Sequence, residues 1–311
     1  MKTRRNFLKL SIGSLLFADT LSLFGAEKTL NTLQQHQSLR STWKIGITDW
    51  DLPGHMGRVT SFALAKEWGF EGVQVSYIPW QGRPSDEDSL AVRANRPRFL
   101  EAAQASGQGI ASLCIGMLND RPLATAPEAE GWVINCLEAM DDMNIDQVLI
   151  PFFGNACMNR HPEHIPLVIE KFKRLAPIAE RYNKILSIES TLTAEDHLPI
   201  IEAIGSSAIK VYYDTWNSAL RGYDIYHEME LLGNKNLISQ IHLKDGYGRY
   251  GETNGNRRLG EGEVNFARTF EILEKTGFEG WVVVETSVGR GEDRAESQMA
   301  NLAFVRNLLG R

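Results

Sequence analysis

The sequence predicts a single α/β domain, a (β/α)8 TIM barrel, because a strand pattern followed by a helix pattern occurs eight times in residues 43–311. Each strand pattern is a short run of apolar, β-branched or aromatic residues, and each helix pattern is a longer segment with apolar residues at helical spacing. The length of this region is typical of one barrel. A doubly wound sheet is disfavoured because no glycine-rich turn of the dinucleotide or P-loop type follows the first strand pattern.

The order of the elements follows from these patterns. Helical spacing is clearest in residues 163–182, where Val168, Phe172 and Leu175 fall on one face. The expected strands are residues 44–48, 72–77, 110–115, 147–152, 185–189, 209–214, 239–243 and 281–285. The expected helices are residues 57–68, 91–106, 128–143, 163–182, 194–204, 225–232, 266–276 and 293–309.

The segment before the barrel has the pattern of an export signal. Residues 3–9 read TRRNFLK, which matches the twin-arginine motif, and the apolar stretch after it contains Asp19 and is too short and polar to span a bilayer. Residues 1–26 are therefore expected to be a signal peptide that the twin-arginine translocation machinery reads, and residues 27–42 a linker. The expected location is the periplasm with no stable membrane span, or with a tether if the signal is not cleaved.

Charge and cysteine content exclude some classes of partner. The net charge of −6 becomes −9 without residues 1–26, which carry four positive side chains and one negative. An acidic body repels a phosphate backbone, so nucleic acid is not an expected partner. Cys114, Cys136 and Cys157 are odd in number and lack Cys-x-x-Cys spacing, so we expect neither a disulfide framework nor a cysteine zinc site.

Four strand patterns in the second half of the chain present side chains that can bind a metal. Three apolar runs finish on a carboxylate, Glu189, Asp214 and Glu285, and a fourth run places His242 on one of its faces. A carboxylate that faces a core carries a large desolvation cost unless a cation compensates it. Because neighbouring strand ends converge in a barrel, these four side chains are expected to bind one divalent ion. Mn²⁺ is the expected ion, with Mg²⁺, Co²⁺ and Zn²⁺ as alternatives.

The motifs around these residues carry a family resemblance. The chain resembles the xylose isomerase-like TIM-barrel superfamily, the sugar phosphate isomerase/epimerase group that includes the ketose 3-epimerases, over about residues 43–309. The resemblance implies that the four residues ligate one divalent metal and that Glu189 and Glu285 also do acid-base work. The motifs are SIES around Glu189, YYDTWN around Asp214, IHLKD around His242, LGEGEVNF at residues 259–266 and VVVET around Glu285.

The same residue types predict proton transfer next to a carbonyl. A metal that binds a sugar carbonyl makes the adjacent proton removable, so Glu189 or Glu285 could abstract it to give a metal-stabilised enediolate, and the other could return a proton. Return to the opposite face is epimerisation, and return to the adjacent carbon is aldose-ketose isomerisation. Loss of a β-hydroxyl group instead is an elimination. The ligands leave these three reactions open.

Further polar and aromatic residues at strand ends are candidates for contacts to a small carbohydrate substrate. Two of them depart from the ketose 3-epimerase pattern. Asn217 stands where that family has a substrate-binding His, and Gly248, followed by Arg249, stands where it has an Arg. The resemblance therefore gives only weak support for a free ketose as the substrate of this chain. Elimination on a 3-keto-glycoside, which is suspected for exported relatives, is the alternative function. The candidates are Trp50, Tyr77, Trp80, Asn119, Asn155, Asn217, Lys244 and Arg249.

Two other classes of protein compete less well with a sugar enzyme. Endonuclease IV shares the barrel, but it needs extra histidines that this chain lacks, including the one at the position of Asn217. A non-catalytic sugar-binding protein would not need a glutamate on each side of the sugar, as Glu189 and Glu285 provide. The sugar remains open, and a homo-oligomer is compatible with the sequence.

Overall fold

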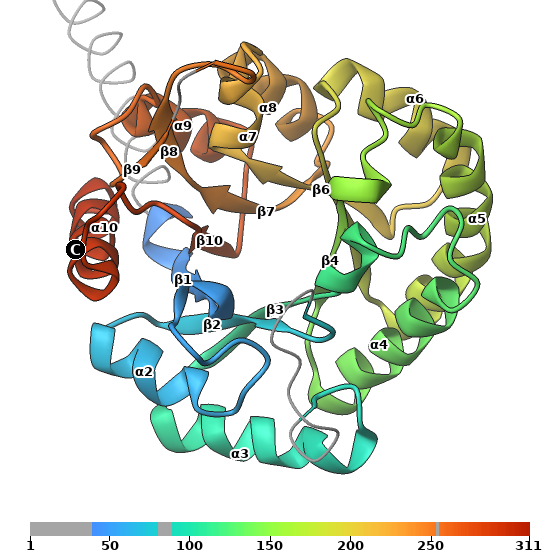
Figure 1. Ribbon diagram of the computed structural model, residues 1–311, viewed down its shortest axis with the longest axis horizontal. Coiled ribbons are helices and arrows are strands. Elements are labelled where there is room, and N and C mark those ends of the chain that lie inside the picture. Colours follow the sequence, from blue (N-terminus) through green and yellow to red (C-terminus); the bar gives the residue numbers. More distant parts are fainter. Residues whose placement is uncertain (1–38, 80–88, 253–254) are drawn as a thin grey trace, which may run out of the picture. The chain divides into compact units, whose positions relative to one another are not determined.

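The computed structural model describes residues 39–79, 89–252 and 255–311 and contains a closed barrel of eight parallel strands (Figure 1). The chain divides into two compact units, Met1–Thr42 and Trp43–Arg311, and the barrel occupies the second. In the first unit residues 39–42 are described and form a helical turn, in which the Thr42 hydroxyl donates to the Leu39 carbonyl oxygen at 2.7 Å. The predicted signal peptide, residues 1–26, and most of the predicted linker lie outside the described residues.

The predicted (β/α)8 barrel is confirmed. Each strand pairs with the next along the chain, and the last strand closes the barrel against the first, with Val282 opposite Ile45. The predicted strand limits agree with the observed ones to within one residue at each end. The barrel strands are β1 (Lys44–Thr48), β2 (Gly72–Ser76), β3 (Gly109–Cys114), β4 (Gln147–Phe152), β5 (Ile185–Ser190), β6 (Ile209–Asp214), β7 (Ile238–Leu243) and β10 (Trp281–Val284).

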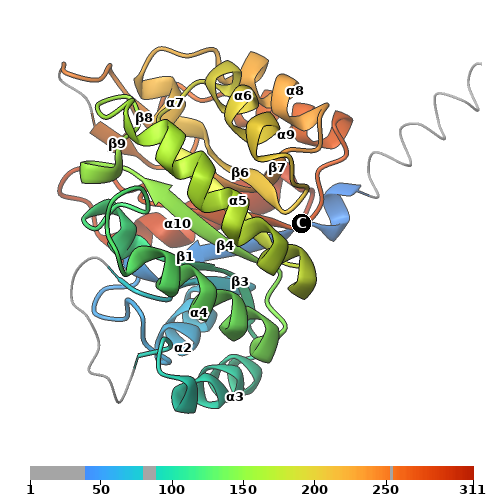
Figure 2. The same cartoon turned by 90° about the vertical axis from the view of Figure 1, so that its right-hand side faces the viewer.

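Helices form a ring around the strands (Figure 1), and the side view shows α4 and α5 running next to each other along it (Figure 2). None of the helices in the described part of the chain has the length and apolar character needed to cross a bilayer. The helices are α2 (Ser61–Trp68), α3 (Arg96–Ser106), α4 (Ala129–Met143), α5 (His164–Tyr182), α6 (Ala194–Ile204), α7 (Thr215–Leu220), α8 (Ile225–Gly233), α9 (Phe266–Lys275) and α10 (Arg294–Leu308).

Two helices begin more than one residue later than the sequence pattern predicts. The first residue of the predicted helix 57–68, Gly57, has a left-handed φ of 67° and donates its N–H to Asp49 Oδ2 at 2.8 Å, so α2 starts only at Ser61. Pro97 lies in the first turn of α3, where its missing N–H costs no helical hydrogen bond, and the helix starts at Arg96.

Several short elements were not predicted. Single 3-10 turns follow β1, β3 and β4, another precedes α3, and a small antiparallel ribbon follows β7. Asp245, at the start of the ribbon, is fully buried and accepts backbone N–H groups from Gly246, Gly260, Gly262 and Val264 at 2.9–3.2 Å. These elements are η1 (Asp49–Asp51), η2 (Arg93–Asn95), η3 (Gly116–Asn119), η4 (Gly154–Ala156), α7, β8 (Asp245–Tyr247) and β9 (Gly255–Arg257).

Apolar residues fill the space between strands and helices, and the Trp281 indole packs against the starts of β2 and β3. A Cβ added to Gly72 would lie 2.4 Å from Trp281 Cη2, and one added to Gly109 would lie 2.7 Å from Trp281 Cζ2, so glycine is required at both strand starts. The three cysteines are buried and form no disulfide. The candidate site lies at the opposite, C-terminal end of the strands, where Asp214 ends β6 and Glu285 follows β10.

Candidate active site

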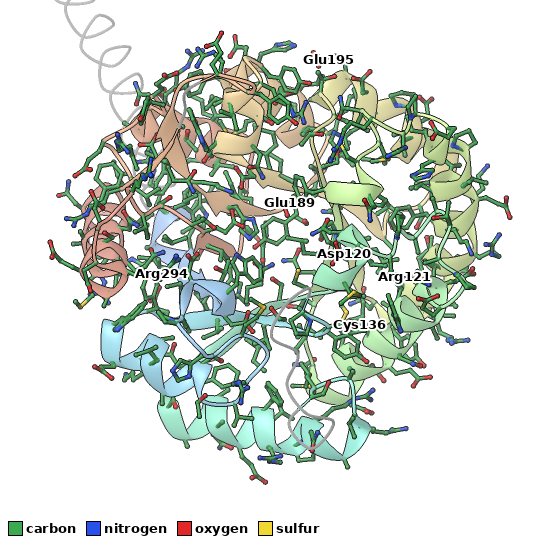
Figure 3. All side chains as sticks on the ribbon, in the orientation of Figure 1. Asp120, Arg121, Cys136, Glu189, Glu195 and Arg294 are labelled. Atoms are coloured by element: carbon green, nitrogen blue, oxygen red, sulfur yellow. The ribbon has the colours of Figure 1, made fainter. Side chains whose placement is uncertain are left out.

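The ends of four neighbouring strands bring the four predicted metal ligands together. Glu189 is in β5, Asp214 ends β6, His242 is in β7 and Glu285 follows β10. His242 Nδ1 lies 3.2 Å from Glu189 Oε1, 4.0 Å from Asp214 Oδ2 and 4.0 Å from Glu285 Oε2. Figure 3 shows Glu189 near the middle of the ring. The convergence arises because strand ends at one rim of a parallel barrel point to a common centre.

The donor atoms of this cluster fit a divalent cation. Asp214 Oδ1 accepts the backbone N–H groups of Trp216 and Asn217 at 2.8 and 2.7 Å, whereas Asp214 Oδ2 is buried and has no hydrogen-bond partner in the described part of the chain. One ligand atom from each of Glu189, Asp214 and His242 lies within 4.8 Å of the others. A buried carboxylate oxygen without a partner is costly, and a bound cation would remove that cost. Carboxylates with one imidazole suit Mn²⁺ or Mg²⁺ well.

A glutamine that the sequence analysis missed orients His242. The Nε2–H of His242 donates to Gln74 Oε1 at 2.7 Å, and Gln74 Nε2 donates to Ser112 Oγ at 3.0 Å. Because Nε2 makes this hydrogen bond, Nδ1 is the nitrogen that faces the carboxylates and can bind a metal once it is deprotonated, the arrangement that metal-binding histidines need. The centroid of the Tyr212 ring lies 4.3 Å from the centroid of the His242 imidazole. In the sequence, the role of Gln74 was indicated only by its position as a polar residue in the middle of the apolar run of β2.

Lys244 provides positive charge inside the cluster. Its Nζ lies 2.9 Å from Glu285 Oε2, 3.8 Å from Asp214 Oδ2 and 3.3 Å from Asn217 Oδ1, and only 13% of the side chain is exposed. Burial lowers the pKa of Lys244, but the charges of Glu285 and Asp214 outweigh burial and raise the pKa above its ordinary value. The side chain is therefore an ammonium ion that partly neutralises the acids.

The crowded carboxylates shift one another's ionisation. Burial raises the pKa of Asp214, the nearby Glu285 and Glu189 add to that rise, and Lys244 opposes it. Burial acts the same way on Glu285, but Lys244 and His242 outweigh it and lower the pKa of this group. The pKa of His242 is raised because Glu189 and Glu285 outweigh the effect of burial. Repulsion among these acids is a second reason why the cluster suits a cation.

A cavity of about 220 Å³ opens beside the cluster. Part of the lining is apolar and comes from β3, β4 and the residue after β4, while other parts carry carboxylate, amide and ammonium groups. A sugar presents both C–H faces and hydroxyl groups, so a lining of both kinds suits it. The lining residues are Trp50, Cys114, Asn119, Leu149, Pro151, Phe153, Glu189, Asn217, Lys244 and Glu285.

Four of the predicted substrate-contact residues line this cavity: Trp50, Asn119, Asn217 and Lys244. Trp50 Nε1 donates to Glu285 Oε1 at 3.2 Å, and Asn217 Nδ2 lies 3.5 Å from Glu189 Oε1. Asn119 Oδ1 accepts the backbone N–H of Phe153 at 2.9 Å and so ties η3 to the end of β4. Trp50 and Asn217 therefore each contact one of the two glutamates that were predicted to be catalytic.

Tyr77 was wrongly predicted to contact the substrate. It is 1% exposed and packs in the core outside the barrel strands, near Arg96 and Cys136. The preceding residue, Ser76, has the inward position and donates its hydroxyl to Asp49 Oδ1 at 2.6 Å. Because side chains alternate along a strand, Tyr77 faces the helices.

Two further predicted contacts lie away from the cavity, and one cannot be placed. Asn155 is exposed and donates to the Asp120 carbonyl oxygen at 3.3 Å, so it joins two loops. Arg249 is half-exposed on the loop between β8 and β9 and pairs with Glu263 at 2.6 Å. The charge of Arg249 is thus satisfied outside the site. Trp80 lies outside the described residues.

Comparisons with known proteins agree with this fold. The family model described as xylose isomerase-like TIM barrel matches residues 62–308. The L-ribulose-5-phosphate 3-epimerase of Salmonella heidelberg is 23% identical over 286 residues, which cover 84% of this chain and 96% of that protein.

Two solved structures share the fold. The 3-keto-D-glucoside 4-epimerase from E. coli superposes with a TM-score of 0.66 at 18% identity and covers 85% of this chain and 99% of its own. A xylose isomerase-like TIM barrel protein from Mycobacterium smegmatis, in complex with magnesium, gives a TM-score of 0.67 at 15% identity and covers 87% and 97%. Sugar epimerases are thus among the relatives of this chain. The chain belongs to the xylose isomerase-like TIM barrel family.

Proposed function

We propose that this protein is a divalent-metal-dependent sugar isomerase or epimerase that moves a proton on a carbon next to a carbonyl group. The observation that carries the proposal is that Glu189 and Glu285 line one cavity beside Asp214, whose buried Oδ2 accepts no hydrogen bond from the described residues. The epimerase activity of the curated relative supports the same reaction class.

The metal in this proposal is held by Glu189, Asp214 and His242, with Glu285 as the fourth ligand. When bound, a divalent ion polarises the sugar carbonyl and stabilises the negative charge that develops on its oxygen. Mn²⁺ is our first choice because it suits a ligand set with several carboxylates and one imidazole, and Mg²⁺ is the first alternative because a solved relative contains it.

The two glutamates reach the cavity from different sides. Glu189 comes from β5 and Glu285 follows β10, and β6 and β7 lie between them in the barrel. A proton can therefore be removed from one face of a bound sugar and delivered to the other. Lys244 and Trp50 each hydrogen-bond one oxygen of Glu285, and the positive charge of Lys244 keeps that carboxylate ionised and able to accept a proton.

Solvent deuterium exchange tests the proposal. Protein loaded with Mn²⁺ is incubated in D₂O with a panel of ketoses, and deuterium is expected at the carbon next to the carbonyl. Glu189→Gln and Glu285→Gln should each slow exchange by about 10²- to 10⁴-fold, because each removes one proton-transfer group. The exposed Glu202→Gln, on α6, is the matched control and should exchange at the wild-type rate. Absence of exchange with every sugar tested would contradict the proposal.

Elimination on a 3-keto-glycoside is the second candidate. Asn217 lines the cavity at the position where ketose 3-epimerases have a histidine, and a 3-keto-glucoside enzyme shares the fold. The same proton abstraction would then be followed by loss of the anomeric group. Release of an aglycone from a chromogenic 3-keto-glycoside supports elimination, whereas deuterium incorporation with the glycoside intact supports epimerisation.

We also propose that the protein is exported by the twin-arginine route. The proposal is carried by the motif at residues 3–9. Replacing both arginines of the motif by lysine, Arg4→Lys and Arg5→Lys, should retain the protein in the cytoplasm, which cell fractionation measures. Equal periplasmic amounts of variant and wild type would contradict this route.

A further inference from the structure

A buried aspartate joins the end of the first barrel strand to the residue after Glu285. Asp51 lies in η1, directly after β1, and is fully buried. Its Oδ2 accepts the backbone N–H of Thr286 at 2.6 Å and the hydroxyl of Thr48 at 2.8 Å, and its Oδ1 pairs with Arg294 Nη1 at 2.6 Å. Figure 3 shows Arg294, the first residue of α10, between that helix and β1.

The residue that Asp51 holds has an unfavourable backbone conformation. Thr286 has a φ of 49°, in the left-handed region, and a β-branched side chain is rarely found there. Such a conformation persists only where surrounding contacts compensate for it. The short hydrogen bond from the Thr286 N–H to a buried carboxylate is such a contact, and it is stronger than a bond to a neutral acceptor.

This conformation bears directly on Glu285, which precedes Thr286. Glu285 is the last residue that continues the register of β10, since its N–H still donates to the Leu243 carbonyl oxygen at 3.1 Å. The left-handed Thr286 then turns the chain away from the barrel. Trp50, next to Asp51 in η1, donates to the Glu285 carboxylate. The same short turn after β1 therefore contacts both the backbone after Glu285 and its side chain.

We propose that Asp51 is a positioning residue that directs the Glu285 carboxylate to the metal and the substrate by holding Thr286 in the left-handed conformation. The inference rests on the proposed function of Glu285. It assigns a role to a buried acid that does not line the cavity and is not one of the proposed metal ligands.

The test compares Asp51→Asn, Thr286→Gly and the double variant, each as the full chain. Mn²⁺ affinity is measured by titration calorimetry, and kcat and KM by deuterium exchange. Asp51→Asn should weaken Mn²⁺ binding by about 10- to 100-fold, as loss of a supporting residue commonly does, and should lower kcat more than it changes KM. Thr286→Gly should resemble wild type, because glycine adopts a positive φ without strain.

Rescue distinguishes positioning from general stability. Adding Thr286→Gly to Asp51→Asn should restore Mn²⁺ affinity to within about threefold of wild type, because the left-handed turn then no longer needs the carboxylate. Asp49→Asn is the matched control, since Asp49 is equally buried in η1 but bonds to Ser76 and Gly57 instead of Thr286. It should lower the melting temperature and leave Mn²⁺ affinity unchanged.

Several outcomes would overturn the inference. One is an Asp51→Asn variant with wild-type Mn²⁺ affinity and kcat, and another is a double variant that binds Mn²⁺ no better than Asp51→Asn. If Asp51→Asn does not fold, Arg294→Gln, at a side chain that is 40% exposed, carries the test. It should weaken Mn²⁺ binding by about two- to fivefold, and Thr286→Gly should reverse that loss. Wild type that binds Mn²⁺ but exchanges no sugar proton refutes the proposed function and leaves the affinity comparison valid.

Discussion

Gln74→Leu tests whether the contact that orients His242 determines metal affinity. The change removes the acceptor of the His242 Nε2–H bond, which is 2.7 Å long and fully buried, and the donor to Ser112. Leaving one buried imidazole N–H without a partner costs about 1–3 kcal/mol of folding free energy. The imidazole also loses the contact that fixes its tautomer and ring orientation, and such losses weaken metal binding about 10- to 100-fold. Because each tenfold change in affinity corresponds to about 1.4 kcal/mol, the loss of binding free energy and the loss of folding free energy are of similar size.

Titration calorimetry with Mn²⁺ and urea denaturation of the metal-free protein measure the two effects separately. Gln108→Leu is the matched control: Gln108 is a buried amide that donates to the Phe70 carbonyl oxygen at 2.9 Å, at the opposite end of the barrel. It should lower the free energy of unfolding without changing Mn²⁺ affinity. If Gln74→Leu and Gln108→Leu change Mn²⁺ affinity equally, or neither changes it, the role assigned to Gln74 is refuted.

Three further predictions concern stability. Gly109→Ala should destabilise the protein by about 1–3 kcal/mol in urea denaturation, because the added Cβ would clash with Trp281. The same change should cost less in a Trp281→Leu background, and a double variant whose loss equals the sum of the two single losses would contradict the clash. Burial lowers the pKa of His197 to about 4, so this imidazole must stay neutral in the folded protein. The free energy of unfolding should therefore fall by about 3 kcal/mol as the pH drops from 6.5 towards 4. His197→Gln should flatten this pH dependence in urea denaturation measured at several pH values. Asp214→Asn should stabilise the metal-free protein by about 1 kcal/mol, because it removes a buried charge and the repulsion of that charge by Glu285, while weakening Mn²⁺ binding by at least about 100-fold. Loss of both stability and affinity would refute that account of the cluster.

The sequence predicted the barrel because its signals are local. Each strand is a short apolar run and each helix repeats apolar residues at its own period, so the order of elements can be read without knowing which residues meet. The carboxylates of the candidate metal site could also be recognised in the sequence, since a carboxylate at the end of an apolar strand is unusual wherever the strand lies. Glu189 and Asp214 are examples, and the structure brings both to His242.

The short elements and the supporting contacts required the fold. Gln74 and His242 are 168 residues apart, and Asp51 and Thr286 are 235 apart, so no local pattern links them. Tyr77 was wrongly given to the site because a two-residue period shows that faces alternate but does not show which face points into the barrel.

The sequence by itself determined the class of fold, the order of its elements and the strand ends that carry acidic groups, because short-range periodicity and residue chemistry suffice for these. Only the tertiary structure decided which side chains share the cavity, that Gln74 orients the imidazole, and that Asp51 holds the turn after Glu285. Those relations depend on closure of the barrel, which sets side by side the ends of strands that are far apart in the chain.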